Sequence, residues 1–117
     1  MTWEDVVAIG LALPDVEVGS AFGTPALRMR GGFMCRIRDD GETLAIRCDI
    51  EERPFLIDAH EELFVTKHYE AWPMLLVALP QADEQLVREL VEDAWVLKAP
   101  KKLVAQVLGG RDDGHHP

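Results

Sequence analysis

The chain has 117 residues, of which 48% are hydrophobic and 28% are charged, and its formal net charge is −9 at pH 7. This length and composition are typical of a single globular domain with its own hydrophobic core. The net charge argues against non-specific nucleic-acid binding by the molecule as a whole, because that binding depends on cations that displace counterions from phosphates. Any nucleic-acid site must therefore be a local basic surface.

Two further features bear on the cellular compartment. No apolar run approaches the roughly 18 residues that a membrane span needs, and the acidic N-terminus lacks the basic segment of a secretory signal. Cys35 and Cys48 are expected on neighbouring strands, as reduced thiols of the core. We therefore expect a cytoplasmic protein that does not associate with membranes.

The N-terminal segment predicts a helix that Thr2 caps and Pro14 ends, with acidic residues in its first turn. Residues 15–23 then predict a connector, in which Val16 and Val18 can open a short strand.

The next segment predicts three antiparallel strands, over 26–30, 34–38 and 43–48. Asp40 and Gly41 lie between the last two of these strands and favour a tight turn with positive φ at both residues. That turn places Arg36 opposite Ala45, which aligns the apolar residues of both strands on one face.

The hairpin between the first two strands allows two registers. A two-residue turn at Gly31 and Gly32 would place Arg28 opposite Cys35, in the core. A three-residue loop with a bulge would place Arg28 opposite Arg36, and the leucine and methionine of the first strand would then join the core. Because burial of arginine is costly, we favour the second register.

Side-chain alternation sends apolar residues to one face of these strands and arginines to the other. Residues 25–38 contain four arginines and no acid. The predicted basic face comprises Arg28, Arg30, Arg36, Arg38 and Arg47, with Lys67 as an additional contact.

The second half predicts a helix over 51–59, strands over 64–66 and 74–79, a helix that Asp83 caps, and a last helix that starts at Pro100. The run 74–79 is almost continuously apolar, as in a central strand covered on both faces. Gly109 and Gly110 are expected to end the last helix. This order predicts an α+β two-layer sandwich over 1–109, with a mainly antiparallel sheet and helices packed on one face, followed by a flexible tail over 110–117.

The loop over 67–73 is rich in side chains suited to binding, and the candidates for contact with a ligand or partner are His68, Tyr69 and Trp72.

No pattern indicates catalysis. The single serine, Ser20, lacks a nucleophile motif, and the histidines share no metal-binding spacing. We expect neither an enzyme activity nor a bound metal or cofactor.

Several segments, in this order and spacing, resemble the MmcQ/YjbR family of small bacterial proteins, and the match covers nearly the whole chain. They are the helix end Leu13-Pro14, residues 22–29 (FGTPALRM) leading into 31–33 (GGF), Tyr69 to Trp72 before the apolar run 75–79, and 93–95 (DAW) followed by 99–103 (APKKL). The resemblance implies an α+β fold similar to frataxin and to secretion chaperones. It also implies a DNA-binding role through a hairpin-bearing surface, and it brings no catalytic residues.

The arginine face and the resemblance together predict weak DNA binding without strong sequence preference, because phosphate contacts position a protein without reading bases. One alternative is a protein-interaction module, including a homodimer, that uses the same face or the loop 67–73. Another is a small-molecule binder with a pocket near 68–73. A solvated sheet face, balanced by nearby acids, would carry none of these functions.

Overall fold

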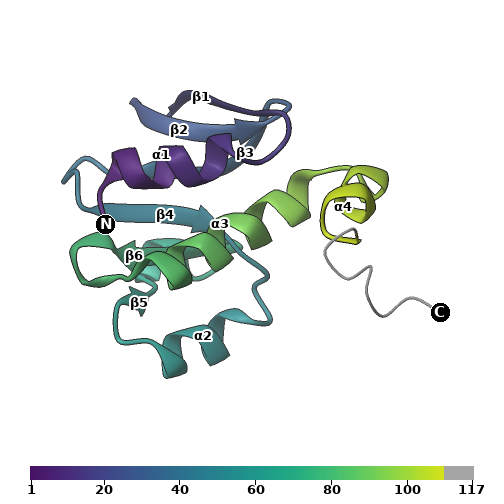
Figure 1. Cartoon of the computed structure of the whole chain (residues 1–117). Coiled ribbons are helices and arrows are strands. Elements are labelled where there is room, and N and C mark those ends of the chain that lie inside the picture. The colour runs from purple at the N-terminus through teal and green to yellow at the C-terminus, as the bar shows by residue number, and fades with distance from the viewer. Residues whose placement is uncertain (110–117) are drawn as a thin grey trace.

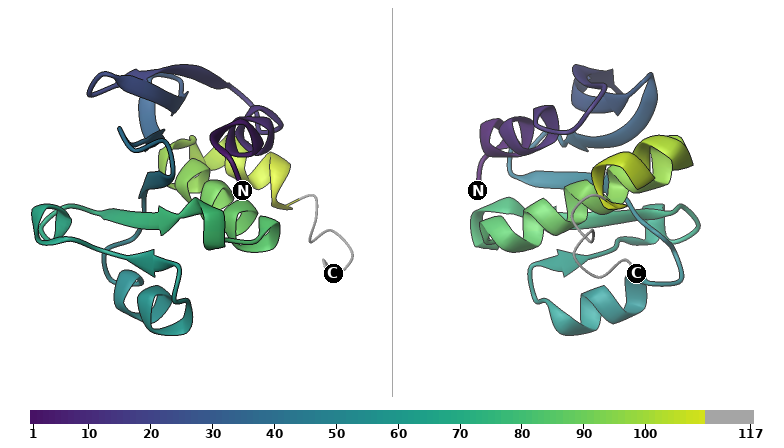
Figure 2. Two further views of the ribbon diagram at one scale, coloured as in Figure 1. Left: turned by 90° about the vertical axis from the view of Figure 1, so that its left-hand side faces the viewer. Right: turned by 45° about the vertical axis from the view of Figure 1, so that its right-hand side comes forward.

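The computed structural model describes residues 1–109. Helices α1 and α3 cover one face of a six-stranded sheet with the strand order β1-β2-β3-β4-β6-β5, and α2 lies at the β5 edge (Figures 1 and 2). The elements are α1 (Trp3–Leu11), β1 (Val16–Ala21), β2 (Thr24–Met29), β3 (Gly32–Ile37), β4 (Thr43–Arg47), α2 (Arg53–Ala59), β5 (Leu63–Phe64), the 3-10 helix η1 (Lys67–Tyr69), β6 (Met74–Ala78), the 3-10 helix η2 (Leu79–Gln81), α3 (Glu84–Lys98) and α4 (Lys101–Val107).

Every strand pair in this sheet is antiparallel, so the predicted two-layer α+β fold is confirmed. Over residues 1–109, no helix has the length and apolar character needed to cross a membrane. The predicted tail, 110–117, lies outside the described residues, and so does Gly110, which was expected to help end the last helix.

Both predicted helix caps form. The Thr2 hydroxyl accepts a hydrogen bond from the Asp5 amide at 3.2 Å, and the Asp5 carboxylate accepts one from the Thr2 amide at 2.9 Å. The Asp83 carboxylate accepts a hydrogen bond from the Leu86 amide at 2.8 Å and so caps α3. These side chains satisfy amides that have no partner inside the helix.

The core lies between the sheet and the two helices. Trp95 of α3 is fully buried, and its indole nitrogen donates to the Pro14 carbonyl at 3.0 Å, which ties α3 to the segment after α1. The central part of β6 is inaccessible on both faces, as its apolar run predicted. Burial raises the pKa of the Cys35 thiol to about 12 and also raises that of Cys48, so both remain protonated thiols in the core at neutral pH.

The hairpin between β3 and β4 has the predicted register, with Arg36 opposite Ala45. The predicted turn is wrong, because only Gly41 has a positive φ. The Asp40 carboxylate instead accepts hydrogen bonds from the Glu42 and Thr43 amides and from the Thr43 hydroxyl, at 2.9, 2.8 and 2.7 Å. These bonds lower the pKa of Asp40, with the Thr43 hydroxyl as the largest cause. Hydrogen bonds to the Asp40 side chain thus stabilise this turn, in place of a second residue with a positive φ.

The observed register of the β2–β3 hairpin differs from the one that we favoured from the sequence. Its turn consists of Arg30 and Gly31, with φ values of 49° and 83°, and a bulge lies between Leu27 and Arg28. Arg28 therefore lies opposite Phe33 rather than Arg36. Arginine still stays out of the core and Leu27 still enters it, because the extra residue lies within the strand and not in the loop.

The predicted connector over 15–23 is largely a strand. Residues of β1 pair with β2 along their whole length, from Val16 opposite Met29 to Ala21 opposite Thr24. Most of its side chains are exposed, as expected of an edge strand whose formation depends on its partner more than on its own propensity.

Substitution of Gly10 in α1 by alanine is expected to lower the free energy of unfolding by about 1–3 kcal/mol, as is usual for overpacking of a core. An added Cβ would lie 2.5 Å from the Cδ1 atom of Leu27, which is fully buried. The gain in helix propensity, at most about 1 kcal/mol, is smaller. Urea unfolding measures the difference, with Gly19→Ala as the control because its Cβ would meet only ordinary contacts on the exposed β1 strand. A more stable Gly10→Ala variant would contradict this account of the helix–sheet contact.

Candidate functional site

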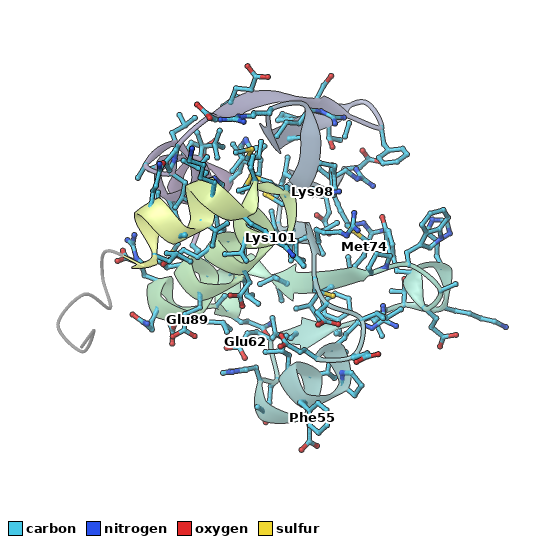
Figure 3. All side chains as sticks on the ribbon, turned by 90° about the vertical axis from the view of Figure 1, so that its right-hand side faces the viewer. Phe55, Glu62, Met74, Glu89, Lys98 and Lys101 are labelled. Atoms are coloured by element: carbon cyan, nitrogen blue, oxygen red, sulfur yellow. The ribbon has the colours of Figure 1, made fainter. Side chains whose placement is uncertain are left out.

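The sheet face opposite α1 and α3 carries a hollow of about 590 Å³. The left view of Figure 2 shows the 67–73 loop projecting from this side of the sheet, away from the two helices. Figure 3 shows the same loop beyond Met74, at the start of β6. We call this cavity the basic-aromatic hollow, and its lining is Ala21, Phe22, Arg28, Phe33, Arg36, Arg47, His68, Tyr69, Trp72, Pro73 and Met74. No carboxylate belongs to this lining.

Arg36 joins the two sides of the hollow. Its guanidinium donates to the Thr24 hydroxyl at 3.0 Å and to the Tyr69 hydroxyl at 3.3 Å. The same group lies 5.3 Å from the centre of the Phe22 ring, within the range of a cation–π interaction. Arg36 thereby connects the β1–β2 turn with the 67–73 loop, 33 residues further along the chain.

Arg38 lies at the border of the hollow, on the Tyr69 ring. Its guanidinium is 5.7 Å from the ring centre, and His68 packs edge-on against the same tyrosine, with 4.9 Å between the ring centres. The Arg38 charge is also the smallest of the causes that lower the pKa of Asp40. The Arg38 guanidinium therefore lies over the Tyr69 ring, with the Asp40 carboxylate in its neighbourhood.

Arg28 and Arg47 differ in how many of their hydrogen-bond donors are used. Arg28 donates to the Ser20 carbonyl at 3.2 and 3.0 Å and to the Gly31 carbonyl at 3.0 Å, so it ties together β1 and the tip of the β2–β3 hairpin. The Nε atom of Arg47 is buried without a hydrogen-bond partner. A buried unsatisfied donor is uncommon in proteins. Arg47 also lines the hollow and takes part in none of the ion pairs of residues 1–109.

The 67–73 loop is held in place by Arg53, which sequence analysis did not select. Arg53 is buried at the first position of α2, with 9% of its surface exposed. Its Nη1 atom donates to the carbonyls of Tyr69, Trp72 and Met74 at 3.2, 2.7 and 3.0 Å, and its Nη2 atom donates to the Glu70 carbonyl at 2.7 Å. In the sequence, Arg53 precedes a proline at the start of a helix, and this pattern is typical of an exposed first turn. Its role depends on carbonyls that lie 16 to 21 residues away.

Charge is distributed unevenly over the fold. Among residues 1–109 the ion pairs are Arg30–Asp15, His60–Glu62 and Arg88–Glu84, so none involves an arginine of the hollow. Four acidic residues, Glu84, Glu89, Glu92 and Asp93, lie on α3. Burial raises the pKa of Asp93, and the neighbouring carboxylates of Glu52, Glu89 and Glu92 raise it further. A net charge of −9 is thus compatible with a sheet face that is locally basic.

The YjbR family model matches residues 11–97, a span that includes the whole hollow and Arg53. The chain belongs to the YjbR family. Two similar proteins, described as uncharacterized proteins of Mycobacterium bovis and Mycobacterium tuberculosis, are each 29% identical to it over 123 residues, covering 92% of this chain and 95% of the relative. No solved structure matches the chain significantly. The suspected family is confirmed.

This YjbR chain brings most of the predicted binding residues together. Those that line the hollow are Arg28, Arg36, Arg47, His68, Tyr69 and Trp72, and Arg38 borders it. Arg30 is separate, because it occupies the β2–β3 turn and its guanidinium forms an ion pair with Asp15 at 2.6 Å. Lys67 is exposed in η1 and does not line the hollow. Phe22 and Phe33, which had not been selected, add two aromatic rings to the lining.

Proposed function

We propose that this YjbR protein binds DNA through its phosphate backbone, without strong sequence preference, and that the arginines of the basic-aromatic hollow make the contacts. The observation that supports this most is a hollow whose lining contains no carboxylate and several guanidinium groups that lie outside the ion pairs of residues 1–109. Arginine matches the geometry of phosphate and keeps its charge at all physiological pH values.

The acidic remainder of the molecule does not prevent such binding at physiological salt. The smallest dimension of the protein is 26 Å, whereas interactions between exposed charges are largely screened beyond about 10 Å at 0.1 M ionic strength. Acids on the helical side of the fold therefore oppose the approach of DNA mainly at low salt. Close to the surface, the local cations dominate the interaction with phosphates.

Salt titration tests this proposal. We expect the logarithm of the DNA affinity to fall with the logarithm of salt concentration with a slope of about −3, since each duplex phosphate contact contributes about −0.9 and the face offers three to four arginines. Fluorescence anisotropy with a labelled DNA oligonucleotide at several salt concentrations measures the slope. Absence of binding at low salt, or a slope near zero, would refute backbone contacts as the basis of binding.

The hollow itself favours a second candidate function, the binding of a small anionic aromatic molecule. Its volume of about 590 Å³ is in the usual range of small-molecule sites, about 300–1,000 Å³. Its lining combines aromatic rings with a few directed donors, as such sites do. Calorimetry with mononucleotides distinguishes the two functions, because a small ligand bound in the hollow should saturate at one site per chain and compete with DNA.

A further inference from the structure

Phe22 has a backbone conformation that a bulky residue rarely adopts. Phe22 and Gly23 form the two-residue turn between Ala21 and Thr24, with φ values of 53° and 80°. Such turns favour asparagine, aspartate or glycine, because both central residues need a positive φ. The Phe22 side chain is also 85% exposed, so burial does not compensate for the strain. Strain without a packing benefit is typical of functional positions.

A second exposed ring lies in the 67–73 loop. Trp72 is 61% exposed, and Arg53 holds its carbonyl at 2.7 Å, so an exposed indole is presented on an anchored backbone. Phe22 and Trp72 line the same hollow, in which Arg36 is in contact with the Phe22 ring. Exposed rings beside cations are the means by which proteins bind unpaired bases and their phosphates.

We infer that the basic-aromatic hollow prefers single-stranded over duplex DNA, with bases stacked on Phe22 and Trp72 and phosphates contacted by Arg36 and Arg47. This inference rests on the proposed DNA binding and adds the form of DNA that is recognised. Arginine contacts to phosphate are available from both forms. The faces of the bases are available only from a single strand, because in a duplex each base is stacked on its neighbours. Arg47 lines the hollow and takes part in none of the ion pairs of residues 1–109, so its charge is available to a phosphate.

The test compares Phe22→Asn and Trp72→Ala with the wild type, using labelled oligo(dT) and a duplex of the same length at low salt. We expect each variant to bind oligo(dT) between about 5-fold and about 150-fold more weakly, the range that corresponds to the loss of one base–aromatic stack. Duplex affinity should change by less than about 3-fold, since phosphate contacts remain. Phe22→Asn should also raise the melting temperature, because asparagine tolerates the positive φ.

Phe55→Ala is the matched control. Phe55 is 76% exposed on α2, and Figure 3 shows it away from the 67–73 loop, so its removal should change neither affinity. Equal binding of oligo(dT) and duplex by the wild type, with both ring variants unchanged, would overturn the inference and leave the proposed function intact. Failure of both probes to bind at low salt would overturn the proposed function as well. A lower melting temperature for Phe22→Asn would show that Phe22 stabilises the fold, and would contradict the premise that its backbone is strained without a packing benefit.

Discussion

Replacement of Arg53 by alanine is expected to lower the free energy of unfolding by about 2–4 kcal/mol and to loosen the 67–73 loop. Arg53 makes four hydrogen bonds to backbone carbonyls, and bonds to charged groups are worth about 1.5–3 kcal/mol each. The net loss is smaller than their sum, because the variant no longer buries a charged group and water reaches some of the carbonyls. The loop should become more mobile, since one guanidinium group donates to the carbonyls of three of its residues, Tyr69, Glu70 and Trp72.

Urea unfolding measures the change in stability, and hydrogen exchange of the amides in 67–74 measures the change in the loop. Arg53→Lys should recover only a small part of the loss, because an ammonium group lacks the planar set of donors that reaches several carbonyls. Arg88→Ala is the matched control, because its ion pair with Glu84 is exposed on α3 and worth about 0.5 kcal/mol or less. An Arg53→Ala protein with wild-type stability and loop protection would show that other contacts position the loop.

The largest expected effect on binding comes from the double variant Arg36→Gln and Arg47→Gln. We expect DNA affinity at low salt to fall by at least about ten-fold and the salt slope to become less negative by about 2, since each lost contact removes about 0.9 from the slope on duplex DNA. The double variant should stay folded. Arg47→Gln removes a buried donor that has no partner, and Arg36→Gln removes partly buried hydrogen bonds to two hydroxyl groups.

The control carries the same change of charge on the other side of the fold, as Lys101→Gln with Lys102→Gln. These lysines are exposed in α4, and Figure 3 shows Lys101 beside the helices, away from the 67–73 loop. If overall charge decided binding, both pairs of substitutions would weaken it alike. If the hollow is the interface, only the first pair reduces the salt slope. A folded Arg36→Gln, Arg47→Gln protein with an unchanged slope would exclude these arginines from the interface.

Local sequence signals predicted much of the fold correctly, because they depend on neighbours along the chain. Thr2 and Asp83 cap their helices through residues three positions away, and such a pattern is visible in the sequence itself. The alternation that separates Cys35 from Arg36 follows from the two-residue period of a strand. This alternation holds even though the predicted register of β2 and β3 was wrong, because the bulge shifts the pairing without placing arginine in the core.

The composition of the site was decided by tertiary structure. Arg30 and Arg53 look alike in the sequence, yet one forms an ion pair beside an exposed turn and the other is buried under the 67–73 loop. The hollow exists because contacts such as that between Arg36 and Tyr69 bring together segments 33 residues apart. The sequence alone therefore determined which faces are apolar and which are basic, since side-chain direction is a property of the local backbone. Packing between distant segments decided which basic and aromatic side chains share one cavity, since the energies of those contacts depend on the whole fold.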